Sequence, residues 1–190
     1  MRILMLGNSF TYFHDMPKLV AAITGEEVVS HTRGGAYLSE QLNAETEMGA
    51  KTLKALKEEK WDYVVMQEQS KGPIAAKESF MESVRGLCEL ARKAGAKPVL
   101  YASWAYREGS EKLTSTGMSY NEMADGLYAS YHEAANENGA LVADVGTAFT
   151  AMRGIVELYE PDDYHPSAAG SMLAAHTIAK VIEEDRRNNK

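Results

Sequence analysis

The chain has little of what would place it among disulfide-linked, zinc-binding or membrane-spanning proteins. It contains one cysteine, Cys88, in 190 residues, so it can form no internal disulfide and offers no set of thiolates for a zinc site. No apolar run approaches the ~20 residues that cross a bilayer. Proline is sparse, and no segment has the proline, glycine or serine content of a linker. We therefore expect one globular domain over residues 1–190.

Positive charge is also scarce. Lysine and arginine total 20 against 27 aspartates and glutamates, which gives a formal net charge of −7. Because no basic stripe is present, the chain is a poor match for the phosphate backbone of a nucleic acid, and we expect no such partner. The same negative charge disfavours strongly anionic substrates, unless Arg33, Lys71 or Arg107 makes the mouth of a site locally positive.

The first apolar run, residues 3–7, is too short for the h-region of a signal peptide and has no small-residue cleavage site. If Met1 is the natural start, this predicts a cytoplasmic protein, whereas a secreted protein with its signal peptide trimmed would have the same sequence. The chain shows no amphipathic helix of the membrane-surface type, so we expect no membrane partner. The sequence makes no prediction about oligomeric state.

Short β-rich runs alternate along the chain with longer helical stretches. The expected strands are 3–7, 27–31, 61–66, 97–102 and 141–145, and the expected helices are 16–24, 45–59, 77–94, 119–138 and 167–185. Continuous apolar runs are typical of parallel strands that are covered on both faces. The alternation predicts the α/β class, with a flavodoxin-like three-layer α/β/α sandwich around a five-stranded parallel sheet. Sites in such folds lie beyond the carboxyl ends of the strands.

Ser9 directly follows the first expected strand and precedes an expected helix. A serine there can present its hydroxyl at the active-site edge, and its backbone N–H lies near the positive end of a helix, where it suits an oxyanion. Serine becomes a nucleophile only with a neighbouring base. The alternative interpretation is a serine that helps to cap a helix.

A candidate base lies near the other end of the chain. His165 precedes Pro166, which favours the first position of a helix, so we expect His165 to cap the last helix and to stay neutral there. Asp162 precedes His165 by three residues, a spacing that can bring a carboxylate to one ring nitrogen and leave the other facing the site. Asp163 is the competing carboxylate, with a turn or a cap as its other role. The segment could also be an ordinary turn into a helix.

Candidate oxyanion donors follow the second and third strands. Gly35 lies in a Gly-Gly turn whose backbone can approach a ligand closely, although such turns are often only turns. Gln67 and Gln69 follow the third strand, where a carboxamide can supply an uncharged donor. Neither the glycine spacing nor a Gly-Lys-Ser/Thr ending of a nucleotide-binding loop is present.

Aromatic residues follow the second and fourth strands. Tyr37, Trp104 and Tyr106 are candidates for a substrate pocket, because aromatic rings can form an apolar wall or stack against a sugar. The alternative for Trp104 is that it covers the edge of the sheet. The histidines show no paired ligand motif such as His-Glu-x-x-His, so we expect no metal site.

Taken together, these segments resemble the SGNH, or GDSL-like, hydrolases, especially a bacterial subgroup that begins with Gly-Asn-Ser-Phe-Thr. The resemblance runs from Ile3 to Ala175. Residues 7–9 match the first family block with asparagine in place of aspartate, and Gly35, or Gly34 with a slip of one residue, matches the second. Residues 162–166 match the Asp-x-x-His-Pro block. The third block departs, because residues 67–70 read Gln-Glu-Gln-Ser where Gly-x-Asn is usual.

The resemblance implies an SGNH-type serine esterase that needs no metal or organic cofactor. Ser9 would attack a small acyl ester, His165 would act as the base and Asp162 would orient it. The N–H groups of Ser9 and Gly35, with Gln67 or Gln69, would form the oxyanion hole. A carbohydrate O-deacetylase acting on an acetylated sugar is one form of this activity. The alternative of a different class is a non-catalytic, flavodoxin-like module that binds a small ligand.

Overall fold

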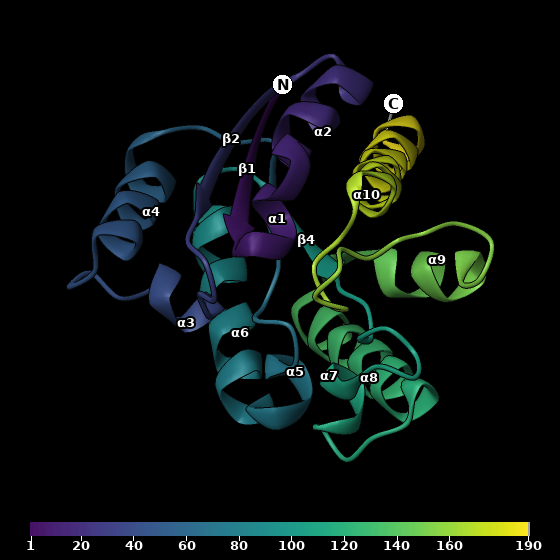
Figure 1. The fold of residues 1–190 in the computed structure, drawn as a ribbon. Coiled ribbons are helices and arrows are strands. Elements are labelled where there is room, and N and C mark those ends of the chain that lie inside the picture. Colours follow the sequence, from purple (N-terminus) through teal and green to yellow (C-terminus); the bar gives the residue numbers. More distant parts are fainter. Residues whose placement is uncertain (190) are drawn as a thin grey trace.

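A five-stranded parallel sheet organises the chain. Figure 1 shows helices packed around it. The structure is a computed structural model that describes residues 1–189. The strands are β1 (Arg2–Gly7), β2 (Glu27–Thr32), β3 (Tyr63–Met66), β4 (Lys97–Ala102) and β5 (Leu141–Asp144). They pair in parallel in the order β2-β1-β3-β4-β5. The predicted α/β fold class is therefore confirmed.

The long helices also follow the expected pattern. They are α2 (Met16–Thr24), α4 (Glu47–Glu58), α6 (Lys77–Lys93), α8 (Tyr120–Asn138) and α10 (Ala168–Asn188). The sequence did not predict α9 (Val145–Met152), the single-turn helices α1 (Ser9–Tyr12), α3 (Leu38–Gln41), α5 (Gly72–Ala75) and α7 (Glu111–Thr114), or the 3-10 turn η1 (Phe13–Asp15). The four-residue helices are too short to show a helical period.

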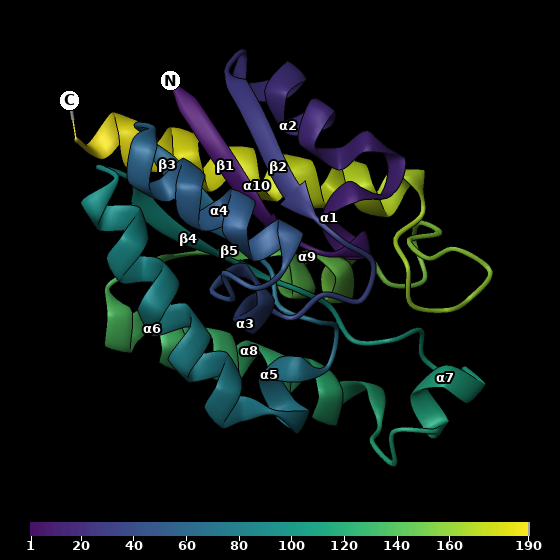
Figure 2. The same ribbon diagram turned by 90° about the vertical axis from the view of Figure 1, so that its left-hand side faces the viewer.

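The two faces of the sheet carry separate apolar cores. Leu4 and Leu6 of β1 point to one face and Ile3 and Met5 to the other, as the alternation of side chains along a strand requires. The first core packs beneath α4, α6 and α8, and the second packs beneath α2, α9 and α10. Figure 2 shows the sheet between these two helical layers. This double covering explains why the strands read as continuous apolar runs.

The N-cap of the last helix is not the residue that the sequence predicted. Ser167, not His165, is its N-cap, and the Ser167 hydroxyl accepts a hydrogen bond from the N–H of Gly170 at 3.1 Å. A serine hydroxyl reaches the free N–H groups of a first turn, a role for which histidine is not a preferred residue. His165 therefore lies in the loop before α10, where its ring can turn toward the sheet edge.

The strand order places a topological switch beside β1. The chain passes from β1 outward to β2 and then returns across β1 to β3, so the segments after β1 and β3 diverge at the carboxyl edge of the sheet. Ligands in doubly wound folds bind in the crevice at such a point. Ser9 follows β1 and Gln69 follows β3, so both lie at this switch.

Candidate active site

The turn that carries Ser9 is held by its neighbours. Asn8 caps α1: its Oδ1 accepts from the N–H of Phe10 at 3.1 Å, and its Nδ2 donates to the carbonyl of Ala36 at 3.0 Å. Ser9 is then the first residue of α1, and among residues 1–189 its own N–H has no acceptor. The asparagine that replaces the usual family aspartate thus ties the serine turn to the loop after β2.

Gln67 supports the same turn from β3. Its Oε1 accepts from the N–H of Asn8 at 3.2 Å and from the hydroxyl of Thr11 at 2.9 Å. The side chain is fully buried, and its Nε2 donates to the carbonyl of Glu68. A Cβ on Gly7 would lie 2.3 Å from the Thr11 hydroxyl, so only glycine leaves room here. The structure therefore corrects the prediction for Gln67: it braces the Ser9 turn and does not face the site.

His165 joins Ser9 to Asp162. Its Nε2 lies 2.8 Å from the Oγ of Ser9, and its Nδ1 lies 2.6 Å from the Oδ2 of Asp162. A carboxylate only accepts hydrogen bonds, so in the neutral imidazole the proton sits on Nδ1 and Nε2 accepts from the serine hydroxyl. Burial opposes ionisation of Asp162, but its hydrogen bonds with the ring and N–H of His165 and the N–H of Tyr164 outweigh it and lower its pKa.

Aromatic rings hold the imidazole of His165. The ring of Phe13 lies parallel to it with 4.2 Å between centroids, and the ring of Tyr164 lies 4.1 Å away at a tilt of 37°. The indole N–H of Trp104 donates to the carbonyl of Tyr164 at 3.0 Å and fixes the adjacent backbone. These contacts restrict the orientation of the ring toward Ser9.

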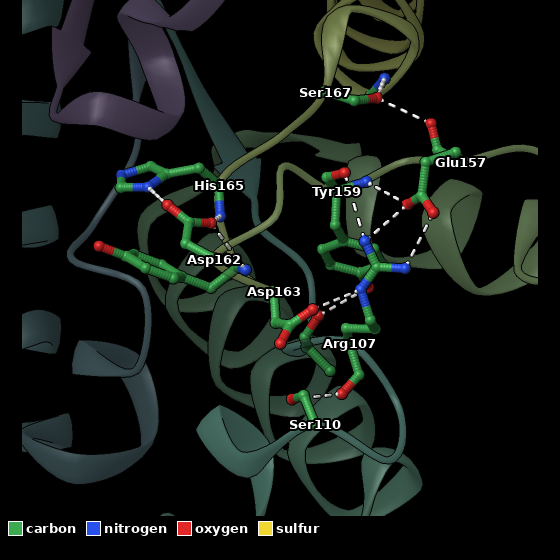
Figure 3. A network of polar contacts seen from close by, with 11 residues as sticks. Arg107, Ser110, Glu157, Tyr159, Asp162, Asp163, His165 and Ser167 are labelled. Carbon is green, nitrogen blue, oxygen red and sulfur yellow. Dashed lines mark hydrogen bonds and ion pairs between the residues drawn. The ribbon is translucent and has the colours of Figure 1, made fainter.

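The loop before α10 is anchored by Arg107, as Figure 3 shows. The guanidinium donates to both carboxylate oxygens of Glu157, at 2.9 and 2.8 Å, and forms a 2.7 Å ion pair with Asp163. Asp163 has a φ of +69°, an uncommon conformation for a residue other than glycine. The two neighbouring aspartates therefore separate: Asp163 is held against Arg107, while Asp162 points to His165 (Figure 3).

A cavity of about 440 Å³ opens beside Ser9 and His165. Its lining includes Gly34, Gly35 and Gln69. Gly35 has a φ of +71°, which favours glycine. Gln69 donates from its Nε2 to the hydroxyl of Ser70 at 3.1 Å, which leaves a second amide hydrogen free. Of the two candidate glutamines, Gln69 is the one that faces the cavity.

The predicted substrate-pocket residues lie in three different places. Tyr106 lines the cavity, and its hydroxyl lies 2.7 Å from the hydroxyl of Ser70. Tyr37 is half-exposed at the start of α3 and is not part of the cavity wall. Trp104 is fully buried, with its ring between Phe10 and Phe149 at centroid distances of 4.5 and 4.0 Å. The prediction that Trp104 faces the substrate is therefore corrected, and the alternative that it covers the sheet holds.

The cavity wall also contains residues that the sequence did not single out. They are Tyr12, Phe13, Tyr164 and Lys112. Tyr12, Phe13 and Tyr164 lie within four residues of Ser9 or His165, so proximity to those residues is the signal that could have found them. Lys112 lies on the single-turn helix α7, which has no recognisable pattern.

Glu68 is a buried carboxyl group behind the cavity. Its carboxylate accepts from the N–H of Gln69 at 2.6 Å and from the N–H of Leu38 at 3.2 Å. Burial raises the pKa of Glu68 to about 7, against the opposing effect of these two backbone donors. Glu68 thus links the segment after β3 to the helix that follows the Gly34–Gly35 turn.

Residues 1–189 contain neither a cluster of metal ligands nor a membrane-spanning helix. In this part of the chain no three histidine, cysteine, aspartate or glutamate side chains gather closely enough to hold a metal ion. None of the helices described is both long and apolar enough to cross a bilayer.

A serine next to an imidazole at the switch point of a parallel sheet is the arrangement of an α/β serine hydrolase. Comparison with solved structures narrows the class. An inferred SGNH hydrolase from Slackia heliotrinireducens is 47% identical, over 96% of this chain and 98% of its own, with a TM-score of 0.92. The chain belongs to the SGNH hydrolase family and is a serine ester hydrolase. The predicted resemblance is therefore confirmed.

More distant structures share the fold. A DUF4886 family protein from Bacteroides uniformis is 20% identical with a TM-score of 0.73, over 95% of this chain and 82% of its own. A catalytic mutant of Axe2, an acetylxylan esterase from Geobacillus stearothermophilus, is 17% identical with a TM-score of 0.68, over 95% and 93%. No protein-family model matches the chain. No curated protein sequence matches it either.

Proposed function

We propose that the protein hydrolyses small acyl esters with Ser9 as nucleophile, His165 as general base and Asp162 as the group that orients it. One observation carries the proposal: two hydrogen bonds in series, of 2.8 and 2.6 Å, join the serine hydroxyl, the imidazole and the carboxylate. This is the geometry by which a base activates a serine that is otherwise a weak nucleophile.

The first half of the reaction forms an acyl-enzyme. The Oγ of Ser9 bonds to the ester carbonyl carbon while its proton passes to the Nε2 of His165, and the carbonyl electrons move onto oxygen. Asp162 stabilises the resulting imidazolium. The tetrahedral intermediate then collapses, the bond to the alcohol oxygen breaks, and His165 returns the proton to that oxygen.

Water completes the cycle by the same route. His165 takes a proton from the water as its oxygen bonds to the acyl carbon. When the bond to Ser9 breaks, His165 gives the proton back to the Oγ, and the carboxylic acid leaves. No step requires a metal or an organic cofactor.

The developing oxyanion has three candidate donors around the cavity. Within residues 1–189 the Ser9 N–H has no acceptor and Gln69 has a second amide hydrogen without one, while Gly35 presents its backbone in a left-handed turn. Removing one preorganised donor from such a site costs about 3 kcal/mol in the barrier. On this proposal Gln69 takes the place of the asparagine that most family members have in the third block.

We propose acetylated carbohydrates as the substrates. The cavity of about 440 Å³ is within the usual range for small-molecule sites, and Tyr12, Tyr106 and Tyr164 give it an aromatic wall with polar tips. The fold similarity to an acetylxylan esterase supports the same class of substrate. A screen of acetylated mono- and oligosaccharides against p-nitrophenyl esters of increasing acyl length checks it.

Ser9→Ala tests the proposed nucleophile. The variant removes the attacking oxygen, so turnover of p-nitrophenyl acetate should fall by about 10⁴-fold or more. Far-UV circular dichroism and thermal unfolding should remain those of the wild type, because no other side chain depends on the Ser9 hydroxyl except His165. Wild-type turnover in a folded Ser9→Ala variant would overturn the assignment.

A further inference from the structure

The wall of the cavity beside Ser9 is positively biased, in contrast to the net charge of the chain. The formal net charge is −7. Among the described residues that line the cavity, Lys112 is the one lysine or arginine, and none is an aspartate or a glutamate. An anionic group that enters this cavity meets a cation and no opposing carboxylate in its wall. The overall charge therefore does not describe the site.

The other cations considered from the sequence do not supply this charge. Arg33 is paired with Glu40, and Arg107 is paired with Glu157 and Asp163. Lys71 is exposed and does not line the cavity. Lys112 differs from all three, because it lines the cavity and is not among the lysines that form ion pairs within residues 1–189. An anionic ligand in the cavity could therefore pair with the ammonium of Lys112.

Two tyrosine rings hold the Lys112 ammonium in place. Its Nζ lies 4.3 Å from the ring centroid of Tyr164 and 5.7 Å from that of Tyr106. Cation–π contacts of this kind position an ammonium without neutralising it. The ring of Tyr106 is itself held in place, because it is buried and its hydroxyl is hydrogen-bonded to that of Ser70.

The ammonium is also close to the reacting groups. The ring of Tyr164 contacts Lys112 and also lies 4.1 Å from the ring of His165, whose Nε2 is hydrogen-bonded to Ser9. A single small molecule can therefore place an ester carbonyl at Ser9 and an anionic group at Lys112 within one cavity.

We propose that Lys112 is a specificity residue that selects esters bearing a carboxylate, such as an O-acylated acidic sugar or hydroxy acid. The proposal rests on the proposed function, since it places the ester carbonyl at Ser9. The carboxylate can belong to the alcohol part or to the acyl part of the ester, and the two are separated by the substrates of the test. Because Lys112 is exposed to solvent, the expected preference is modest, about five- to tenfold in kcat/KM.

The test compares matched charged and neutral esters. For the alcohol part, 4-acetoxybenzoate is paired with neutral 4-acetoxybenzamide. For the acyl part, mono-4-nitrophenyl adipate is paired with 4-nitrophenyl hexanoate. The ratio of kcat/KM for the charged ester to that for the neutral ester is measured in the wild type and in each variant, so that intrinsic reactivity cancels between proteins.

Lys112→Met should lower this ratio about five- to tenfold for at least one pair, mainly through KM, and Lys112→Arg should restore most of it. Lys71→Met is the control, because Lys71 is an exposed cation near the cavity that does not line it. Its ratio should equal that of the wild type. Added salt should reduce the wild-type ratio toward that of Lys112→Met.

Unchanged ratios for both pairs in Lys112→Met would overturn the role of Lys112. The proposed function would still hold in that case if the protein hydrolysed the neutral esters and if this hydrolysis required Ser9. A loss of Lys112→Met activity that is equal for charged and neutral esters would also overturn it, because a structural role has no charge preference. Failure of the wild type to hydrolyse any of the four esters would overturn the proposed function itself, and the role of Lys112 with it.

Discussion

Two histidine–carboxylate pairs in this chain resemble one another in their immediate contacts. His165 lies 2.6 Å from Asp162 in the loop before α10, and His132 on α8 lies 2.7 Å from Asp144 at the end of β5. An aromatic ring also packs against each imidazole: Phe13 lies 4.2 Å from His165, and Tyr128 lies 4.0 Å from His132. A short contact with a carboxylate and an aromatic neighbour are therefore common to both.

The difference lies in which ring nitrogen the carboxylate occupies. Asp162 takes the Nδ1 of His165, so the nitrogen at the tip of the ring, Nε2, is free to meet Ser9. Asp144 takes the Nε2 of His132, so the remaining nitrogen is Nδ1, which is closer along the side chain to the histidine's own backbone. No hydroxyl or thiol in residues 1–189 is hydrogen-bonded to His132. Of these two pairs, His165–Asp162 is the one whose free ring nitrogen faces a hydroxyl that it can activate.

Removal of charge from each carboxylate gives the largest expected contrast. Asp162→Asn should lower kcat for p-nitrophenyl acetate by about 10³- to 10⁴-fold, because an amide no longer fixes the tautomer or stabilises the imidazolium. Asp144→Asn should leave kcat within about twofold, since its partner does not touch the cavity. Steady-state kinetics on both variants check this. Comparable losses in the two would remove the distinction between the pairs.

A smaller effect is expected at Glu68, whose buried carboxylate accepts from the N–H groups of Gln69 and Leu38 behind the cavity. Its folded-state pKa of about 7 lies above the ordinary value of 4.5, so the folded state retains a proton that the unfolded chain loses. The stability contributed by this proton is full below pH 4.5 and is lost as the pH rises toward 7. The loss is up to ~3 kcal/mol, at about 1.4 kcal/mol per pKa unit.

Glu68→Gln cannot titrate, so it separates this effect from others. Urea unfolding of the wild type and of Glu68→Gln at pH 5 and pH 8 should show the wild type losing stability relative to the variant at the higher pH. Neighbouring Glu40 acts in the same direction, since its negative charge also raises the pKa of Glu68. A wild-type-minus-variant difference that is constant between the two pH values would show that Glu68 titrates as an ordinary exposed glutamate.

The sequence predicted the sheet, its long helices and the three residues Ser9, His165 and Asp162. This was possible because continuous apolar runs and helical periods are local, and because Asp162 and His165 are near neighbours in the chain. The choice between Gln67 and Gln69 was not local. It depends on β3 ending at Met66, after which one glutamine turns inward to Asn8 and the other turns to the cavity.

Trp104 and Lys112 show the limit of such patterns more clearly. Trp104 turns into the core because Phe149 stacks against it, and Phe149 belongs to α9, a helix with no predicted counterpart. Lys112 reaches the cavity because a loop far from Ser9 in sequence folds back over Tyr164. Both positions are set by tertiary contacts between segments whose own sequences are unremarkable.

The central claim is that His165, and not His132, activates Ser9. Its most direct test is the rate of labelling by a fluorophosphonate, followed by intact-mass spectrometry and peptide mapping. We expect one adduct, on Ser9, with a rate that falls at least ~100-fold in His165→Ala and stays within about twofold in His132→Ala. Absence of an adduct on Ser9 in the folded wild type, or equal labelling in both histidine variants, would contradict the account.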